Sequence, residues 1–193
     1  MKLETYLRIH KIPYQDTQFI IKYLNNLRHI DYDDHLTPEM KSSAHALQRM
    51  VDEHTYWIMI HYRWVIDNEK KEMRQTKWSN FKIWLVTKIA KIQTYIQGVG
   101  RHTNSEVLEL LDQDVGALSS YLGEKPYMLG DNPSKLDCSV FGQLSQFKWH
   151  LSETDANKLI IEKYPNINKY LERMKTTYWP DWEDSITHGC GDK

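Results

Sequence analysis

Two histidines and two tryptophans on one predicted helix form the richest imidazole and aromatic cluster of the chain. His54 and His61 are seven residues apart, with Trp57 and Trp64 beside them. In a helix this spacing puts both imidazoles on one face, about 10.5 Å apart along the axis. That distance is too long for the adjacent-turn histidine pair of H-E-x-x-H metal sites, so we expect no metal. The alternative to ligand binding is packing in a core or an interface.

Two short motifs predict helix starts with hydrogen-bonded caps. Ser134-Lys-Leu-Asp137 has the spacing of a capping box, in which a hydroxyl and a carboxylate each satisfy a backbone amide of the other residue. We expect this structural box to fix a buried helix start, and the loss of either group to cost about 0.5–2 kcal/mol. Thr103 and Glu106 form a second box. Asp16 can cap a further helix.

The elements that carry these residues are predicted to be helices. A short helix at 3–11 is followed by Ile12-Pro13-Tyr14, where proline favours an extended backbone. A second helix follows Asp16, and a polar linker ends near His35. We therefore expect a first unit at 1–35, a helical bundle at 36–182 and a polar tail at 183–193.

The bundle is expected to begin with a long helix. Thr37 is a typical cap, Pro38 suits the first helical position, and no glycine or proline interrupts the pattern before about Ile66. The second half of this helix has too many apolar positions for one stripe, which predicts burial on several sides. Further helices are expected at 81–97, 103–122, from 134, at 154–164 and at 165–178.

Composition narrows the possible classes of protein. The 25 Lys and Arg nearly balance the 26 Asp and Glu, which gives no electrostatic footprint for nucleic acid. No apolar run approaches the roughly 20 residues that span a bilayer. Cys138 and Cys190 are too few and too far apart for a disulfide framework, so we expect a cytoplasmic protein. Cys138 lies in an apolar helical pattern and is expected to be a small buried hydrophobe.

Several segments resemble the glutathione transferase family. KPYMLGDNPS with LDCSVFGQL resembles the loop and capped helix of its C-terminal domain, and YPNINKYLERMK resembles the closing helix. MKLETYLRIHKIPYQ and DTQFIIKYL resemble the first and last helices of its thioredoxin-like N-terminal domain. HALQRMVDEHTYWIMIHYRW with GVGRHTNSE resembles the failed axon connections branch, which is related to metaxins. The resemblance implies a mainly α fold, a transferase C-terminal-like bundle with a remnant of the thioredoxin-like domain.

The resemblance also implies two sites. Asp16 and Thr17 match the acid and hydroxyl that bind the γ-glutamyl end of glutathione at a helix N-terminus, with plain helix capping by Asp16 as the alternative. The helix that carries His54, Trp57, His61 and Trp64 would line a hydrophobic ligand pocket.

One departure from the family bears on catalysis. The residue that activates the glutathione thiol has no counterpart, because Met1 stands where the first strand of the family should already have ended. The segment with the cis-proline has none either, because only Gln15 stands between Tyr14 and Asp16. We therefore expect no catalytic residue, and no cofactor beyond weak residual binding of glutathione.

Three functions remain open. The first is a non-catalytic cytoplasmic interaction or scaffold protein with an unnamed protein partner, a possible homodimer, and an implied neuronal or stress role. The second is a glutathione-dependent transferase whose N-terminal domain is incomplete in this sequence. The third is a metaxin-like component of mitochondrial import, which the lack of an apolar anchor after Tyr178 disfavours.

Overall fold

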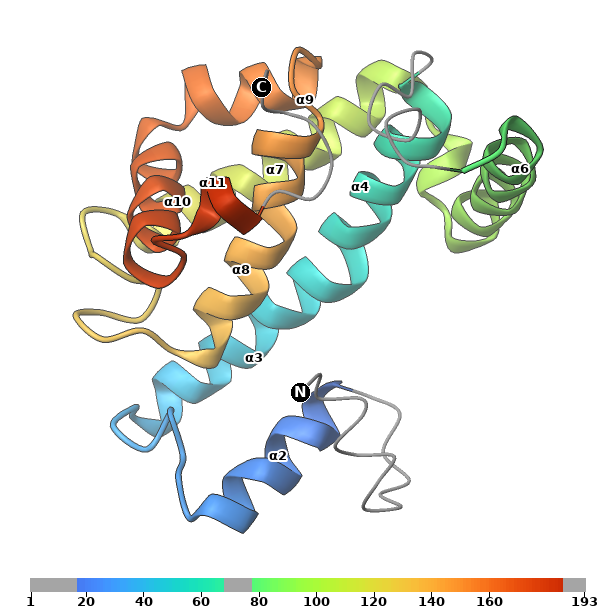
Figure 1. The fold of residues 1–193 in the computed structure, drawn as a ribbon. Coiled ribbons are helices and arrows are strands. Elements are labelled where there is room, and N and C mark those ends of the chain that lie inside the picture. Colours follow the sequence, from blue (N-terminus) through green and yellow to red (C-terminus); the bar gives the residue numbers. More distant parts are fainter. Residues whose placement is uncertain (1–16, 68–77, 186–193) are drawn as a thin grey trace. The chain divides into compact units, whose positions relative to one another are not determined.

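The computed structural model describes residues 17–67 and 78–185 (Figure 1). It divides the chain into two compact units, Met1–Leu36 and Thr37–Lys193. The predicted helix at 3–11, the extended residues around Pro13, and Asp16 and Cys190 lie outside the described residues. In the first unit, helix α2 covers Thr17–Arg28 and begins directly after Asp16, where the sequence places a cap.

The second unit begins with the predicted long helix, which runs from Pro38 to Ile66. Its consecutive parts are α3 (Pro38–Met50), η1 (Val51–Thr55), α4 (Tyr56–His61) and η2 (Tyr62–Ile66). The hydroxyl of Thr37 accepts a hydrogen bond from the backbone N–H of Met40, 3.2 Å away, as expected of an N-cap. η1 and η2 are single π turns within the α-helix. Such turns are often found at functional sites.

The remaining helices begin and end close to the expected positions, because caps and glycines mark them. Glu106 and Thr103 form the predicted capping box, and the positive φ values of Gly98 and Gly123 end two helices. The elements are α6 (Asn80–Gln97), η3 (Val99–Arg101), α7 (Asn104–Leu122), α8 (Lys135–Ser145), η4 (Gln146–His150), α9 (Asp155–Lys158), η5 (Leu159–Lys163), α10 (Pro165–Tyr178) and α11 (Trp182–Ser185).

The core of the second unit lies between α7, α8 and α10, with η1 and α4 against them. Helix α7 contributes a stripe at helical spacing, and the other elements add the large side chains. Residues with no exposed surface include Ile58, Leu111, Val115, Leu118, Leu144, Phe147, Ile167, Tyr170 and Leu171. The second half of the long helix is buried on several sides, as predicted, since Met59, His61 and Tyr62 are all buried.

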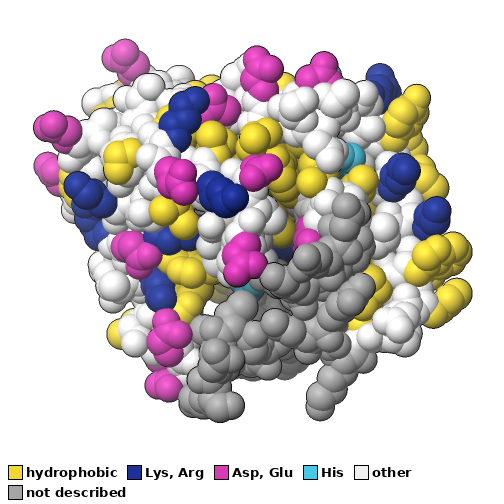
Figure 2. All heavy atoms as spheres, turned by 90° about the horizontal axis from the view of Figure 1, so that it is seen from above, with side chains coloured by type: hydrophobic (Ala, Val, Ile, Leu, Met, Phe, Trp, Pro, Cys, Tyr) yellow, Lys and Arg dark blue, Asp and Glu magenta, His cyan; other side chains and the backbone are white. Residues whose placement is uncertain are grey.

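Helix α6 stands at the side of this unit, against α4 and η2 (Figure 1). Its contact with them is a small apolar cluster of Trp64, Ile83 and Ala90. At the edge of the molecule where α6 lies, Figure 2 shows hydrophobic and Lys or Arg side chains with no acidic ones among them.

The mainly helical fold predicted from the sequence is confirmed. Among the described residues the β structure is limited to one isolated bridge between Tyr127 and Gly130. None of the helices in the described ranges is long and apolar enough to cross a membrane.

Two details differ from expectation. Cys138 is exposed rather than buried, because it lies on the outer side of α8 next to the buried Asp137. Helix α11 spans position 183, where we expected the polar tail to begin. The aromatic rings of Trp179 and Trp182 hold this end of the chain on Phe141, with ring centroids 4.7 and 6.3 Å away.

Candidate functional site

The predicted glutathione site falls at the border of the described residues. Thr17 is the first residue of α2, and Asp16 lies outside the described part of the chain. Glutathione binding by this pair therefore stays a prediction.

His54 ties the first π turn to α7. Its Nδ1 lies 2.9 and 3.0 Å from the two carboxylate oxygens of Asp114. The buried hydroxyl of Thr55 donates to the same carboxylate at 2.6 Å. The widened turn of η1 places these two adjacent side chains on one acceptor. Because the carboxylate of Asp114 is buried, this pair of partners offsets much of the cost of its desolvation.

His61 ties the same helix to α6 instead. The imidazole is buried, and its Nδ1 lies 3.1 Å from the hydroxyl oxygen of Thr94. That hydroxyl donates to the carbonyl of Lys91, so its oxygen accepts from His61 and we assign the imidazole proton to Nδ1. Burial, and secondarily the positive charge of Lys91, lowers the pKa of His61 below its ordinary value of 6.5.

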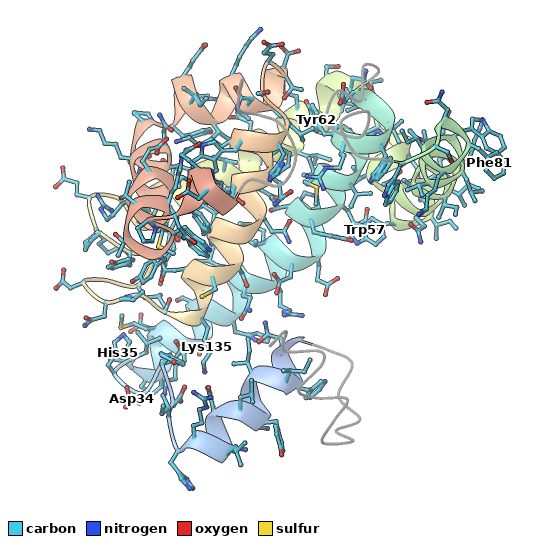
Figure 3. The ribbon with its side chains drawn as sticks, viewed as in Figure 1. Asp34, His35, Trp57, Tyr62, Phe81 and Lys135 are labelled. Atoms are coloured by element: carbon cyan, nitrogen blue, oxygen red, sulfur yellow. The ribbon has the colours of Figure 1, made fainter. Side chains whose placement is uncertain are left out.

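The two tryptophans of the predicted pocket also differ in environment, and Figure 3 labels one of them, Trp57. Trp64 is buried and stacks on Trp78, with ring centroids 6.3 Å apart. Trp57 is half-buried on α4 and makes an edge-on contact with Tyr56 at 5.4 Å. Of the four predicted residues, His54 contacts α7, His61 and Trp64 contact α6, and Trp57 contacts Tyr56 of its own helix. A hydrophobic ligand pocket lined by them stays a prediction.

Asp137 is the centre of the second predicted motif and does more than cap α8. Its fully buried carboxylate accepts from the backbone N–H and the hydroxyl of Ser134, at 2.8 and 2.7 Å. It also accepts from the backbone N–H of Met128 at 2.9 Å and from the hydroxyl of Tyr170 at 3.0 Å. One carboxylate therefore joins the loop before α8, the start of α8, and α10.

Tyr170 is a residue whose role the sequence did not reveal. Burial raises the pKa of its phenol well above the ordinary range, and the charge of Asp137 raises it further. The hydroxyl therefore stays protonated and donates at any physiological pH. Its position among the apolar residues of α10 indicated only a core side chain.

Lys148 was also missed by sequence reasoning. Its ammonium group is buried and donates to Asn168 and Glu172 of α10. It also lies 4.7 Å from the ring centroid of Trp149. The carboxylate and the amide compensate the buried charge of this lysine, which indicates a structural role. Among the described residues no group of three or more His, Cys, Asp or Glu could hold a metal ion.

Two family models match the chain. A glutathione S-transferase N-terminal domain matches residues 14–70, and a glutathione S-transferase C-terminal domain matches residues 111–174. The first match crosses the division between the two units, since it extends through the long helix. The second covers most of α7, the capping box of Asp137, and most of α10.

Curated relatives point the same way. Failed axon connections of Drosophila melanogaster is 29% identical over 89% of this chain and 46% of its own length. Isoprene-epoxide–glutathione S-transferase of Rhodococcus is 27% identical over 84% of this chain and 72% of its own length. Metaxin-2 of Mus musculus is 34% identical over 44% of this chain and 32% of its own length.

The chain spans about half the length of the Drosophila relative. No solved structure matches it. Both transferase domain models occur in the order of the transferase fold. The two matched domain models place the chain in the glutathione S-transferase superfamily, and failed axon connections and metaxins are among the proteins to which it is similar.

Proposed function

We propose that this protein is a non-catalytic member of the superfamily that acts as a cytoplasmic interaction or scaffold protein. One observation carries the proposal. The helix expected to line a hydrophobic ligand pocket uses its imidazoles to hold neighbouring helices, His54 on Asp114 and His61 on Thr94. These side chains stabilise the bundle and are not free to position a substrate.

The relatives support a protein whose role is interaction. Failed axon connections covers most of this chain, and metaxins recur among the matches. A neuronal or stress role, an unnamed protein partner and a homodimer belong to the same proposal. We further propose that glutathione binds weakly or not at all, because one acid–hydroxyl pair orients only one end of the tripeptide.

The test is a transferase assay on the full chain. We expect no conjugation of glutathione to a general electrophile above the uncatalysed rate, and no retention on immobilised glutathione. The matched variants are Thr17→Ala, which removes the proposed glutathione contact, and Ser42→Ala, which removes an exposed hydroxyl bonded only to its own helix. The proposal would be overturned if the unchanged protein conjugates glutathione, Thr17→Ala abolishes this activity and Ser42→Ala preserves it.

Such a result would favour the second candidate, a glutathione-dependent transferase. The specific observation behind this candidate is the bacterial transferase relative, of which the chain covers 72%. A third candidate, a metaxin-like role in mitochondrial import, is favoured by the metaxin relatives. Fractionation of cells that express the protein separates this candidate from a cytoplasmic scaffold.

A further inference from the structure

Helix α6 is apolar on two opposite faces. Its inner face contributes Ile83, Ala90 and Thr94, which are buried against α4 and η2. A helix that belongs to a bundle alone needs only one such face. The other face of α6 therefore calls for an explanation of its own.

The outer face of α6 is a continuous row of large exposed side chains. They follow one another at intervals of three and four residues, as neighbours on one side of a helix do. Phe81, at the start of the row, points away from the bundle (Figure 3). The members of this outer face, with their exposed fractions, are Phe81 69%, Trp84 54%, Leu85 41%, Ile89 45%, Ile92 60%, Tyr95 59% and Ile96 69%.

The charged side chains on α6 and on the connection to α7 have a single sign. Residues 78–105 contain four cations, Lys82, Lys88, Lys91 and Arg101, and no acidic residue. The other 165 residues carry the remaining 21 Lys and Arg and all 26 Asp and Glu. At the edge where α6 lies, Figure 2 shows Lys and Arg side chains (dark blue) between hydrophobic ones (yellow), without Asp or Glu (magenta). The face is thus suited to a negatively charged surface.

Helix α6 also lies outside the parts that match the family models. One match ends at residue 70 and the other begins at residue 111. The family-model matches therefore carry no information about the outer face of α6.

A second copy of the chain is a poor occupant. Lys88 lies in the middle of the outer face, near the midpoint of Asn80–Gln97. Antiparallel pairing of two such faces about their centres would bring the two Lys88 ammonium groups together, and like charges at an interface oppose association.

We propose that the outer face of α6 docks on the surface of an anionic phospholipid bilayer. Eighteen residues give a helix about 27 Å long that lies in the plane of the interface. The Trp, Phe and Ile side chains enter the boundary between headgroups and acyl chains. Lys82, Lys88 and Lys91 reach lipid phosphates with flexible stems, as lysines at membrane interfaces do. This docking is independent of the proposed interaction function.

The test is co-sedimentation of the full chain with vesicles. Phosphatidylcholine vesicles with roughly 30% phosphatidylserine should bind the protein at least about tenfold more tightly than pure phosphatidylcholine vesicles. Raising the salt from about 0.1 M to about 0.5 M should weaken binding, because the contribution of the lysines is screened. A blue shift of the tryptophan emission should accompany binding.

Two variants with matched controls locate the surface. Ile92→Glu and the pair Lys88→Gln with Lys91→Gln should each weaken binding about tenfold or more. Ile161→Glu, at an exposed apolar residue of η5, and Lys169→Gln, at an exposed lysine of α10, should leave binding unchanged. Circular dichroism of each variant verifies that the bundle is folded.

Two results would overturn the proposal. Equal binding of the α6 variants and the unchanged protein would place membrane contact elsewhere. The second result is that the protein binds neither kind of vesicle and instead forms a dimer or a protein complex that Ile92→Glu disrupts. This result would assign the outer face to a protein partner. The transferase assay is unaffected by these outcomes, so the two proposals fail separately.

Discussion

At the scale of single residues, two buried carboxylates in the second unit each bond to residues of other elements of the fold. Asp137 accepts hydrogen bonds from Ser134, Met128 and Tyr170, and Asp114 accepts from His54 and Thr55. A buried acceptor of this kind is costly to remove, because buried donors around it then lose a hydrogen bond.

Asp137→Ala should therefore cost more than an ordinary cap. We expect a loss of about 3 kcal/mol in the free energy of unfolding, above the roughly 0.5–2 kcal/mol of a lost N-cap. The excess arises because the N–H of Met128 loses its acceptor, and the hydroxyl of Tyr170 keeps only the 3.3 Å hydrogen bond to the backbone carbonyl of residue 137. Urea denaturation measures it, with Ser134→Ala as the control that removes one hydroxyl from the motif. Equal losses for the two variants would mean that Asp137 acts only as a cap.

His61 should make stability depend on pH. Its pKa in the folded protein is lowered from 6.5 by burial, and further by Lys91. Above 6.5 the imidazole is neutral in both states and has no effect. As the pH falls below 6.5 the unfolded chain takes up the proton first, so the free energy of unfolding decreases until the lowered pKa is reached.

Urea midpoints between about pH 7.5 and about pH 5 test this expectation. The decrease should be smaller in His61→Gln than in the unchanged protein. His45→Gln, which alters an exposed histidine of α3, should keep the full decrease. The same pH dependence in all three proteins would assign it to other groups.

At the scale of elements, the turns between helices determine how closely the helices pack. The tight connection after α6 depends on Gly100. A Cβ there would lie 2.7 Å from the backbone nitrogen of Tyr95 and 2.8 Å from the carbonyl carbon of Thr94. Because both are backbone atoms of α6, the contact cannot be relieved by turning a side chain.

Gly100→Ala should thus destabilise the protein by about 1–3 kcal/mol, the usual cost of overpacking. Gly142→Ala is the matched control, since its Cβ would meet nothing within 4 Å on the exposed side of α8. There alanine should raise stability by up to about 1 kcal/mol, because it favours the helix. Thermal unfolding of both variants measures the difference. Stabilisation by Gly100→Ala would contradict the packing of η3 on α6.

At the scale of the whole molecule, the protein is an assembly of helices in two units. Far-ultraviolet circular dichroism of the full chain should show a helix-dominated spectrum. A strand content near the roughly 20–25% of ordinary globular proteins would contradict this architecture. The transferase assay and the vesicle experiment address what the assembly does.

Local sequence alone determined where the helices of the second unit begin and end. The box of Thr103 and Glu106, the cap at Thr37, and Gly98 and Gly123 act within about one helical turn. Their effect does not depend on the rest of the chain. The start of α8 was predicted from Ser134 and Asp137 for the same reason.

Tertiary structure decided which partners the side chains meet. His54 and His61 share a predicted helix face, yet one contacts α7 and the other α6, because a π turn and the position of α6 direct them apart. The exposure of Cys138 was mispredicted because its neighbours in the sequence are buried while it is not. Helix α6 is apolar on both faces, so its sequence could not indicate which face is covered. That choice depends on contacts with α4 and η2, which are distant in sequence, and periodicity within one helix carries no information about them.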